Sequence, residues 1–261
     1  MPRRRKILIH ENHTPNSIMK IIEVPGDKAL QELTRLLAKK AVTGLHPVWF
    51  GGNSDITFIA EGRSRVKNPK TSITKSMKMN IDEMIADFYS PDSNDGEPRE
   101  EEPAEEAWVL EEEQETGDEL EEGSEEEAGE ESGEESEVTD GDDELDLYCS
   151  RKPPHTVHIG LLDIDEPWQM FAHLGWGGSD SDFQCALHRR WQEEWGAEVI
   201  VLQESIIECR VLRPPQTRKD AMRLAREQYF YCGDIVSQGT GSVLELADAL
   251  LDCTSWFFWW D

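Results

Sequence analysis

The sequence predicts an α/β (or α+β) protein with a mixed sheet that contains an antiparallel hairpin, is flanked by helices and is interrupted by a disordered acidic insert. Three observations carry this prediction. Short apolar runs typical of strands alternate with segments whose apolar residues recur every three or four positions, as they do in helices. Two apolar runs, 198–202 and 206–212, are separated by three polar residues, a spacing that predicts a hairpin. Between the patterned regions lies a stretch, 92–146, without apolar periodicity.

Nearly all of the net charge lies in that stretch. The chain has 261 residues and a formal net charge of −29. Residues 1–91 carry 15 Lys and Arg against 9 Asp and Glu, residues 92–146 carry 1 against 29, and residues 147–261 carry 10 against 17. An acidic stretch of this kind cannot bury enough apolar surface to offset the roughly 1–2 kcal/mol of backbone entropy lost per ordered residue. We therefore expect an N-terminal α/β segment (1–91), a disordered acidic linker or insert (92–146) and a C-terminal α/β domain (147–261).

In the N-terminal segment, apolar runs predict strands at 6–10, 18–24, 45–50 and 55–60. Asp27 predicts a helix start, because its carboxylate can accept hydrogen bonds from amides of the first turn. Gly44 ends this helical region. Its expected buried face is Leu30, Leu33, Leu36, Leu37 and Ala41.

Two further features complete the N-terminal segment. Residues 61–79 are basic and weakly patterned, and they predict a mobile loop. Asn80 and Glu83 then predict the capped start of a short helix.

In the C-terminal domain, strands are expected at 157–162 and in the hairpin, and a short amphipathic piece at 168–174. Three pairs of residues predict capped helix starts: Ser181 with Gln184, Thr217 with Asp220, and Ser242 with Glu245. The closing aromatic run, 256–261, has apolar residues on both faces. That pattern predicts a central strand covered on both sides.

Several classes of protein are excluded. No run of 18 apolar residues is present and no secretion signal is visible, so we expect a cytoplasmic protein with no membrane association. The five cysteines are odd in number and form no Cys-x-x-Cys pair, which argues against a zinc knuckle and against a disulfide framework. The pairs His10/His13 and His155/His158 supply too few ligands for a metal site. No nucleotide-binding fingerprint occurs, and we expect no cofactor and no metal.

A series of motifs in the C-terminal region stands in a characteristic order. They are Leu174 to Gly178, Arg190-Trp191, Trp195 to Glu198, Arg213 to Pro215, Ala225 to Tyr229, Tyr231-Cys232, Asp234 to Val236 and Trp256 to Asp261. In these motifs, residues 157–261 resemble the bacterial domain-of-unknown-function family 4253, and residues 43–48 resemble a segment that members carry upstream. The resemblance implies that both halves belong to one architecture. The family has no established activity, so the resemblance implies no chemistry.

Two regions are candidate ligand-binding sites. Trp176, Gly177 and Gly178 precede a helix N-terminus, where backbone amides could approach an anion. The alternative is a turn with a cap, because Asp180 and Asp182 would repel a phosphate.

The second region comprises Gln228, Tyr229, Tyr231, Cys232 and Asp234. It places a polar residue in an apolar helix stripe, followed by a glycine-containing loop. The alternative is that these groups satisfy neighbouring backbone. The residue pattern assigns no catalytic residue in either region.

We therefore expect a binding or protein-interaction module without evident catalytic chemistry, whose partner is an unknown protein or small molecule and not nucleic acid. One alternative is a small-molecule enzyme that uses the region Glu227–Asp234. Another takes the acidic segment as a nucleic-acid mimic or a binder of basic partners, because of its charge density. Within the acidic stretch, only Trp108 to Leu110 could dock on another surface. Lys219, Arg223 and Arg226 share a helix face, which is either a solvated surface or the place where the acidic segment rests.

Overall fold

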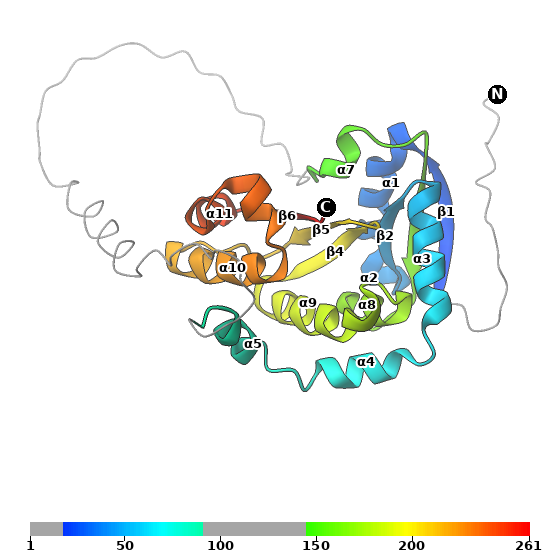
Figure 1. Ribbon diagram of the computed structural model, residues 1–261. Helices are drawn as coiled ribbons and strands as arrows, with labels where there is room; N and C mark the ends of the chain where they lie inside the picture. The colour runs from blue at the N-terminus through cyan, green and yellow to red at the C-terminus, as the bar shows by residue number, and fades with distance from the viewer. Residues whose placement is uncertain (1–17, 91–144) are drawn as a thin grey trace, which may run out of the picture. The chain divides into compact units, whose positions relative to one another are not determined.

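The sheet of this protein draws its strands from both sides of the acidic stretch. The computed structural model describes residues 18–90 and 145–261, and six strands form one sheet in the order β1-β3-β2-β4-β5-β6 (Figure 1). Strands β2 and β4 are parallel and every other neighbouring pair is antiparallel, so the sheet is mixed, as predicted. The strands are β1 (Met19–Pro25), β2 (His46–Gly51), β3 (Thr156–Leu162), β4 (Ala197–Leu202), β5 (Ile206–Val211) and β6 (Ser255–Trp259).

Strand β3 is the junction of the two described stretches. It pairs along its length with β1, with Met19 opposite Leu162 and Pro25 opposite Thr156. On its other side it pairs with β2. The described residues before and after 91–144 therefore build one compact unit. The predicted strand at 6–10 lies outside the described residues, as does the predicted disordered segment except for its last two residues.

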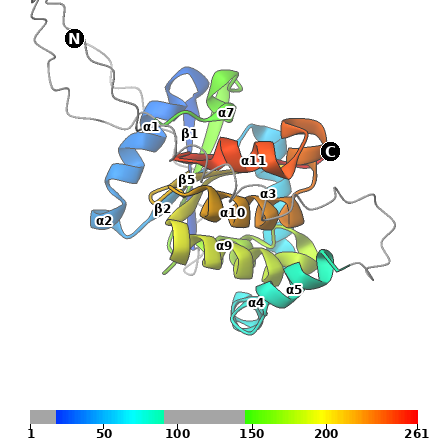
Figure 2. The ribbon, with the colours of Figure 1, turned by 90° about the vertical axis from the view of Figure 1, so that its left-hand side faces the viewer.

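Helices cover both faces of the sheet (Figures 1 and 2). On one face, apolar residues of α1 and Leu147, just before α7, pack against β1 to β4. On the other face lie α3, α8, α9 and α10, with α4 outside α8 and α9, α5 beside α10, and α11 against α10. The helices are α1 (Gly26–Ala38), α2 (Lys40–Thr43), α3 (Asn53–Arg65), α4 (Pro69–Ser76), α5 (Ile81–Phe88), α7 (Tyr148–Arg151), α8 (Met170–Leu174), α9 (Ser181–Trp195), α10 (Arg218–Tyr231) and α11 (Val243–Leu250). Short turns complete the fold: η1 (Pro167–Gln169), η2 (Gly178–Asp180) and η3 (Ile235–Thr240). No helix within 18–90 or 145–261 is long and apolar enough to cross a membrane.

Two predictions for residues 55–79 are wrong, because this region is helical. The run 55–60 belongs to α3, whose start is fixed by the Asp55 carboxylate accepting the Gly52 N–H at 2.9 Å. A short apolar run does not distinguish a strand from a helix by periodicity alone. The predicted loop 61–79 holds the end of α3 and all of α4, which Asn68 caps ahead of Pro69.

Three local predictions at helices also need correction. Ser181 and Gln184 form no capping box, since Asp180 precedes the helix and the Gln184 side chain is used elsewhere. Asp27 lies inside the first turn of α1, one residue after its start. Ala41 is exposed, because α1 ends at Ala38 and α2 turns its residues to solvent. The predicted caps Asn80, Thr217 and Ser242 do accept the expected amide hydrogens.

The closing strand β6 lies at the edge of the sheet, not in its centre. Its two faces are nevertheless covered. Trp256 and Phe258 pack against Trp191 of α9, whereas Phe257 stacks on Trp259 and contacts Tyr148 of α7. Apolar residues on both faces of a strand therefore predict that both faces are packed against other elements. They do not predict that the strand has a neighbouring strand on each side.

A buried carboxylate holds the chain where it re-enters the fold. Glu208 of β5 is almost fully buried, and its two oxygens accept the backbone N–H groups of Tyr148 at 2.7 Å and Cys149 at 2.9 Å. Burial raises the pKa of the Glu208 carboxyl, against the lowering effect of these two hydrogen bonds. The first turn of α7 is therefore tied to the hairpin that follows it by some 60 residues.

Glycines allow α3 and α8 to touch backbone to backbone. A Cβ on Gly175, at the end of α8, would lie 2.6 Å from the Gly62 oxygen in α3. Gly175 also has φ +64°, a conformation that disfavours side chains. This contact fixes the position of the backbone from which the Trp176 side chain extends.

We expect Gly175→Ala to be more damaging than Gly178→Ala. Gly178 has nearly the same φ, +61°, but no atom lies within 4 Å of where its Cβ would stand. Gly178→Ala should lower the free energy of unfolding by about 1–2 kcal/mol, the cost of a left-handed residue. Gly175→Ala should lower it by about 1–3 kcal/mol more, because of overpacking. Urea denaturation measures both, and equal effects would contradict the close contact.

Candidate functional site

The structure brings some of the predicted site residues together and separates others. Trp176, Gly177 and Tyr231 lie around one buried cluster. Trp260 joins it, with ring centroids 5.6 Å from Trp176 and 5.3 Å from Tyr231. Gly177 stands against Gln184, whose Cγ would lie 3.2 Å from an added Cβ. The two predicted regions therefore share an aromatic layer between α9, α10 and the end of β6.

A hydrogen-bond chain runs through the centre of this cluster. The Tyr231 hydroxyl donates to Gln184 Oε1 at 2.5 Å and lies 3.0 Å from His188 Nε2. Because the single hydroxyl hydrogen is used on Gln184, His188 must donate from Nε2. Its Nδ1 is left as a buried acceptor without a partner in the part of the chain that the structure describes. Burial lowers the pKa of His188 to about 3 and raises the pKa of Tyr231. Both groups are therefore neutral near pH 7.

Trp176 closes the cluster on the side of the glycine loop. Its indole N–H donates to the Gln203 carbonyl at 2.7 Å, at the end of β4. Gly177 and Gly178 are exposed and have positive φ, as a tight turn requires. Asp180 and Asp182 follow directly. The loop has the geometry of a turn that positions an indole.

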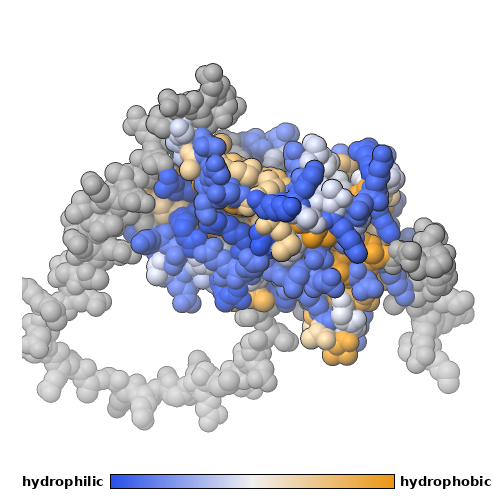
Figure 3. Space-filling view, turned by 90° about the horizontal axis from the view of Figure 1, so that it is seen from below, coloured by the Kyte–Doolittle hydropathy of each residue, from blue (hydrophilic) through white to orange (hydrophobic). Residues whose placement is uncertain are grey.

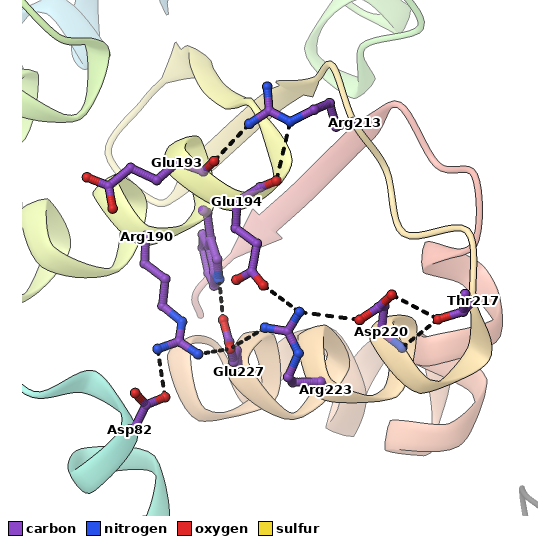
Figure 4. Close-up of polar contacts among 10 residues, drawn as sticks. Asp82, Arg190, Glu193, Glu194, Arg213, Thr217, Asp220, Arg223 and Glu227 are labelled. Atoms are coloured by element: carbon purple, nitrogen blue, oxygen red, sulfur yellow. Dashed lines mark hydrogen bonds and ion pairs between the residues drawn. The ribbon is translucent and has the colours of Figure 1, made fainter.

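A second network surrounds Glu227 (Figure 4). Residue Glu227 is 2% exposed, and its carboxylate oxygens accept from Trp191 Nε1 and Arg190 Nη2, each at 2.8 Å. Arg190 also donates to Asp82 of α5 at 2.7 Å. Burial raises the pKa of the Glu227 carboxyl, and the charge of Arg190 opposes that rise. Both oxygens are occupied, so this carboxylate joins α10 to α9, and Arg190 extends the connection to α5.

Arg223 extends this network along α10. Its guanidinium lies 2.5 Å from the Glu194 carboxylate and 5.2 Å from the centre of the Trp195 ring. Arg226 lies over the ring of Tyr89, at 4.9 Å. The face predicted from Lys219, Arg223 and Arg226 as a solvated surface is thus partly committed to contacts within the fold.

The remaining predicted residues have separate structural contacts. The Cys232 thiol donates to the Trp259 carbonyl at 3.0 Å, and burial raises the pKa of Cys232 to about 11. Asp234 accepts from the Asp261 amide and from Gln238. Tyr229 contacts Phe88 of α5. Gln228 is 2% exposed, and its Nε2 has no hydrogen-bond partner among residues 18–90 and 145–261.

Gln184, His188 and Arg190 are central to these networks and were not among the predicted site residues. They occupy helix α9 at buried or half-buried positions. Polar residues on an otherwise apolar helix face were the available signal for Gln184 and His188. Within the part of the chain that the structure describes, no group of three or more His, Cys, Asp or Glu is arranged to hold a metal.

Two grooves lie on the outer helices, on the lower side of Figure 1. Figure 3 shows this side as mainly hydrophilic, interrupted by hydrophobic patches. One groove, of about 350 Å³, follows α4 and is lined by Asn68, Lys70, Thr71, Thr74, Lys75 and Lys78. The other, of about 400 Å³, is lined by Met79, Met84, Ser179, Asp180, Asp182, Phe183 and Phe230. The sequence pattern did not predict either groove, because residues 61–79 were expected to form a loop.

The two buried glutamines should respond differently to the same substitution. Gln228→Met removes an amide whose nitrogen has no partner among the described residues, and it should leave the free energy of unfolding unchanged or raise it by about 1 kcal/mol. Gln184→Met removes the acceptor of the Tyr231 hydroxyl and should lower it by about 1–3 kcal/mol. Denaturant titration of both variants measures the difference. Equal losses would show that Gln228 has a partner of comparable importance.

Stability should fall on acidification because His188 is held neutral. Its folded pKa, about 3, lies below the unfolded value near 6.5, so between these values the unfolded chain binds the extra proton. Stability is present above pH 6.5 and is lost as the pH falls. Replacing His188 with Phe should reduce the slope of unfolding free energy against pH between 6 and 4 by up to about 1.4 kcal/mol per pH unit. An unchanged slope would contradict the assignment.

Comparison with known proteins identifies the C-terminal part of the chain. No curated protein sequence and no solved structure matches it. Residues 158–261 match the family described as Domain of unknown function (DUF4253). This match agrees with the resemblance seen in the motifs from Leu174 to Asp261, and it does not extend upstream to residues 43–48. Residues 158–261 of this chain are a DUF4253 domain.

Proposed function

We propose that this protein is a binding module, and that its partner is an acidic polypeptide carrying apolar side chains, received on the outer surface of α4 and α5. The observation that carries the proposal is the row of lysines on α4 next to an apolar groove.

The reactive groups of the C-terminal domain support a module without catalytic chemistry. Glu227 is enclosed by Arg190 and Trp191, and Tyr231 is hydrogen-bonded within the core. The Cys232 thiol has a raised pKa and so little nucleophilic thiolate at neutral pH. These contacts weaken the alternative of a small-molecule enzyme in the Glu227–Asp234 region.

The α4 surface has an excess of positive charge. Residues 62–81 contain six Lys and Arg and no Asp or Glu. Lys75 lies 3.7 Å from Asp182, and its side chain is 65% exposed. Within residues 18–90 and 145–261, Lys67, Lys70 and Lys78 form no ion pair. Unpaired amines that line a groove favour an anionic partner, because they attract it over a Debye length of roughly 8 Å at physiological salt.

The neighbouring groove adds apolar surface to this charge. Met79, Met84, Phe183 and Phe230 line it, and Met77 at the end of α4 is 62% exposed. Asp182 belongs to this groove and pairs with Lys75 of the other, so the two grooves adjoin. Methionine side chains adapt to varied partners and contact aromatic rings favourably. A partner with both carboxylates and apolar side chains suits this surface better than a nucleic acid does.

The test uses the full chain and a fluorescein-labelled peptide of 12 residues, with glutamates on either side of a central Trp-Leu pair. Lys70→Glu combined with Lys78→Glu should weaken binding about tenfold, because two weak attractions of up to about 1 kcal/mol each become repulsions. Fluorescence anisotropy at 50 mM salt gives the dissociation constants. Binding should weaken further at 300 mM salt, as exposed charges are screened.

The control is Lys39→Glu combined with Lys219→Glu, which makes the same change in net charge at two exposed lysines away from the grooves. Its affinity should stay within twofold of the unchanged protein. Equal affinity of the two double variants would overturn the proposal. Binding of a labelled 20-nucleotide strand in place of the peptide would also overturn it and would make the surface a nucleic-acid site.

A further inference from the structure

We infer that the partner of this surface carries an arginine next to its apolar side chains, and that Asp180 and the rings of Phe183 and Phe230 bind this arginine. The inference rests on the proposed function and refines the chemistry of the partner. The partner's acidic residues lie on the lysines of α4, and its guanidinium lies in the apolar groove beside them.

The charge of the surface changes sign at the apolar groove. Met79 of its lining belongs to the stretch 62–81, which has six Lys and Arg and no Asp or Glu. Met84 belongs to the stretch 82–90, which has three Asp and Glu and no Lys or Arg. The rest of the lining adds two aspartates and no Lys or Arg. The groove is therefore acidic as well as apolar, whereas the neighbouring groove on α4 is basic.

The two aspartates differ in their contacts. Asp182 lies 3.7 Å from the Lys75 amine. Asp180 is exposed, and within the part of the chain that the structure describes its carboxylate forms no ion pair. It accepts a hydrogen bond from the Ser179 hydroxyl at 3.2 Å, and a carboxylate has room for further donors. A partner with glutamates along its whole length would place a like charge against Asp180.

The aromatic rings of the groove favour arginine among the cations. Phe183 and Phe230 are half-buried, and their ring centroids are 5.6 Å apart in an edge-to-face arrangement. A guanidinium is planar and weakly hydrated, so it stacks on such rings better than an ammonium does. It also matches a carboxylate with two parallel hydrogen bonds. The groove offers rings and a carboxylate together, in about 400 Å³.

The arginines on the neighbouring helices are committed to other contacts. Arg190 donates to Asp82 at 2.7 Å and to Glu227 at 2.8 Å. Arg226 lies over the ring of Tyr89, at 4.9 Å. Neither of them lines the apolar groove. The cation that complements this groove therefore comes from the partner.

The two grooves also set the order of charges along the partner. They adjoin where Lys75 meets Asp182. A segment that crosses from α4 into the apolar groove meets amines first, and then apolar side chains together with Asp180. Its sequence therefore runs from acidic residues to apolar residues and arginine, or in the reverse order.

The experiment uses the full chain and two fluorescein-labelled peptides of 12 residues. Each has four glutamates, then a Trp-Leu pair, then either arginine or citrulline, with serines at the other positions. Citrulline keeps the planar shape of arginine and removes its charge. Both peptides are also made in reversed order, because the grooves do not set the chain direction. In the tighter-binding order, fluorescence anisotropy should give the arginine peptide about fivefold higher affinity, from an exposed ion pair and a cation–π contact together.

Asp180→Asn separates this contact from the rest of the surface. The Asp180 side chain caps no amide of α9, so the substitution should leave the helix intact. In this variant the arginine and citrulline peptides should differ by less than twofold. The matched control is Asp248→Asn, the same change at an exposed residue of α11, and it should keep the fivefold difference.

The outcomes separate this inference from the proposed function. Equal affinity for the two peptides, or a fivefold difference that persists in Asp180→Asn, would overturn the arginine contact. The proposed function would still stand if Lys70→Glu with Lys78→Glu weakened both peptides about tenfold. Binding of neither peptide would overturn both proposals.

Sedimentation velocity of the full chain tests a second copy as the occupant. We expect the same sedimentation coefficient for the unchanged protein and for Lys70→Glu with Lys78→Glu. A dimer that this double variant dissociates would place a second copy on the surface and would overturn the inference.

Discussion

The structure depends on the pairing of β3 with both β1 and β2. The DUF4253 match begins at His158, inside β3, while both neighbours of that strand come from residues before 91. A fragment restricted to the matched residues would leave both sides of this strand without their hydrogen-bond partners, and Trp49 and Val24 would be missing from the core that Ile159 joins. The long stretch between β2 and β3 adds little to the difficulty of forming this sheet, because the entropy of closing a loop grows only with the logarithm of its length.

Buried polar groups in this protein connect helices rather than expose chemistry. Glu227 joins α10 to Trp191 and Arg190 of α9, and Arg190 reaches on to Asp82 of α5. Tyr231 links α10 to Gln184 and His188. Ion pairs of this kind add little net stability against apolar replacements, but removing one partner is costly, so they discriminate one packing of the helices from others. Helix α5 is held by the Arg190–Asp82 contact together with the packing of Phe88 against Tyr229 and Phe230 of α10.

Local chemistry explains which parts of this fold could be predicted from sequence. The caps at Asn80, Thr217 and Ser242 depend on residues three positions apart, and the β4–β5 hairpin depends on a three-residue connection. Long-range facts were not predictable in this way. The edge position of β6 depends on which strand lies beside β5. The helices at 53–76 depend on packing against α8 and α9, which overrides a weak pattern.

In the candidate site, too, local features could be predicted from the sequence and long-range contacts could not. Trp176 and Tyr231 are brought together by Trp260, whose ring contacts both of them just after β6. The spacing between residues 176 and 231 in the sequence does not reveal this contact. The sequence indicated a polar residue, Gln228, in an apolar helix face, but its side chain lies in the core. The hydrogen-bond partner of Tyr231 is Gln184, which belongs to another helix. The lysines of α4 were visible as a basic stretch. Their arrangement along a groove required the helix to be known.

The contact between Glu208 and α7 also has a mechanical consequence. The carboxylate grips the two amides that follow Leu147, immediately after the acidic stretch returns to the described fold. Tension applied at residue 145 would act first on the two hydrogen bonds to Glu208 and on the packing of the buried Leu147. It would act on the hydrogen bonds between β3 and its neighbouring strands only afterwards. A force on the acidic stretch would thus detach the short helix α7 first, and the strand pairing of β3 would stay intact.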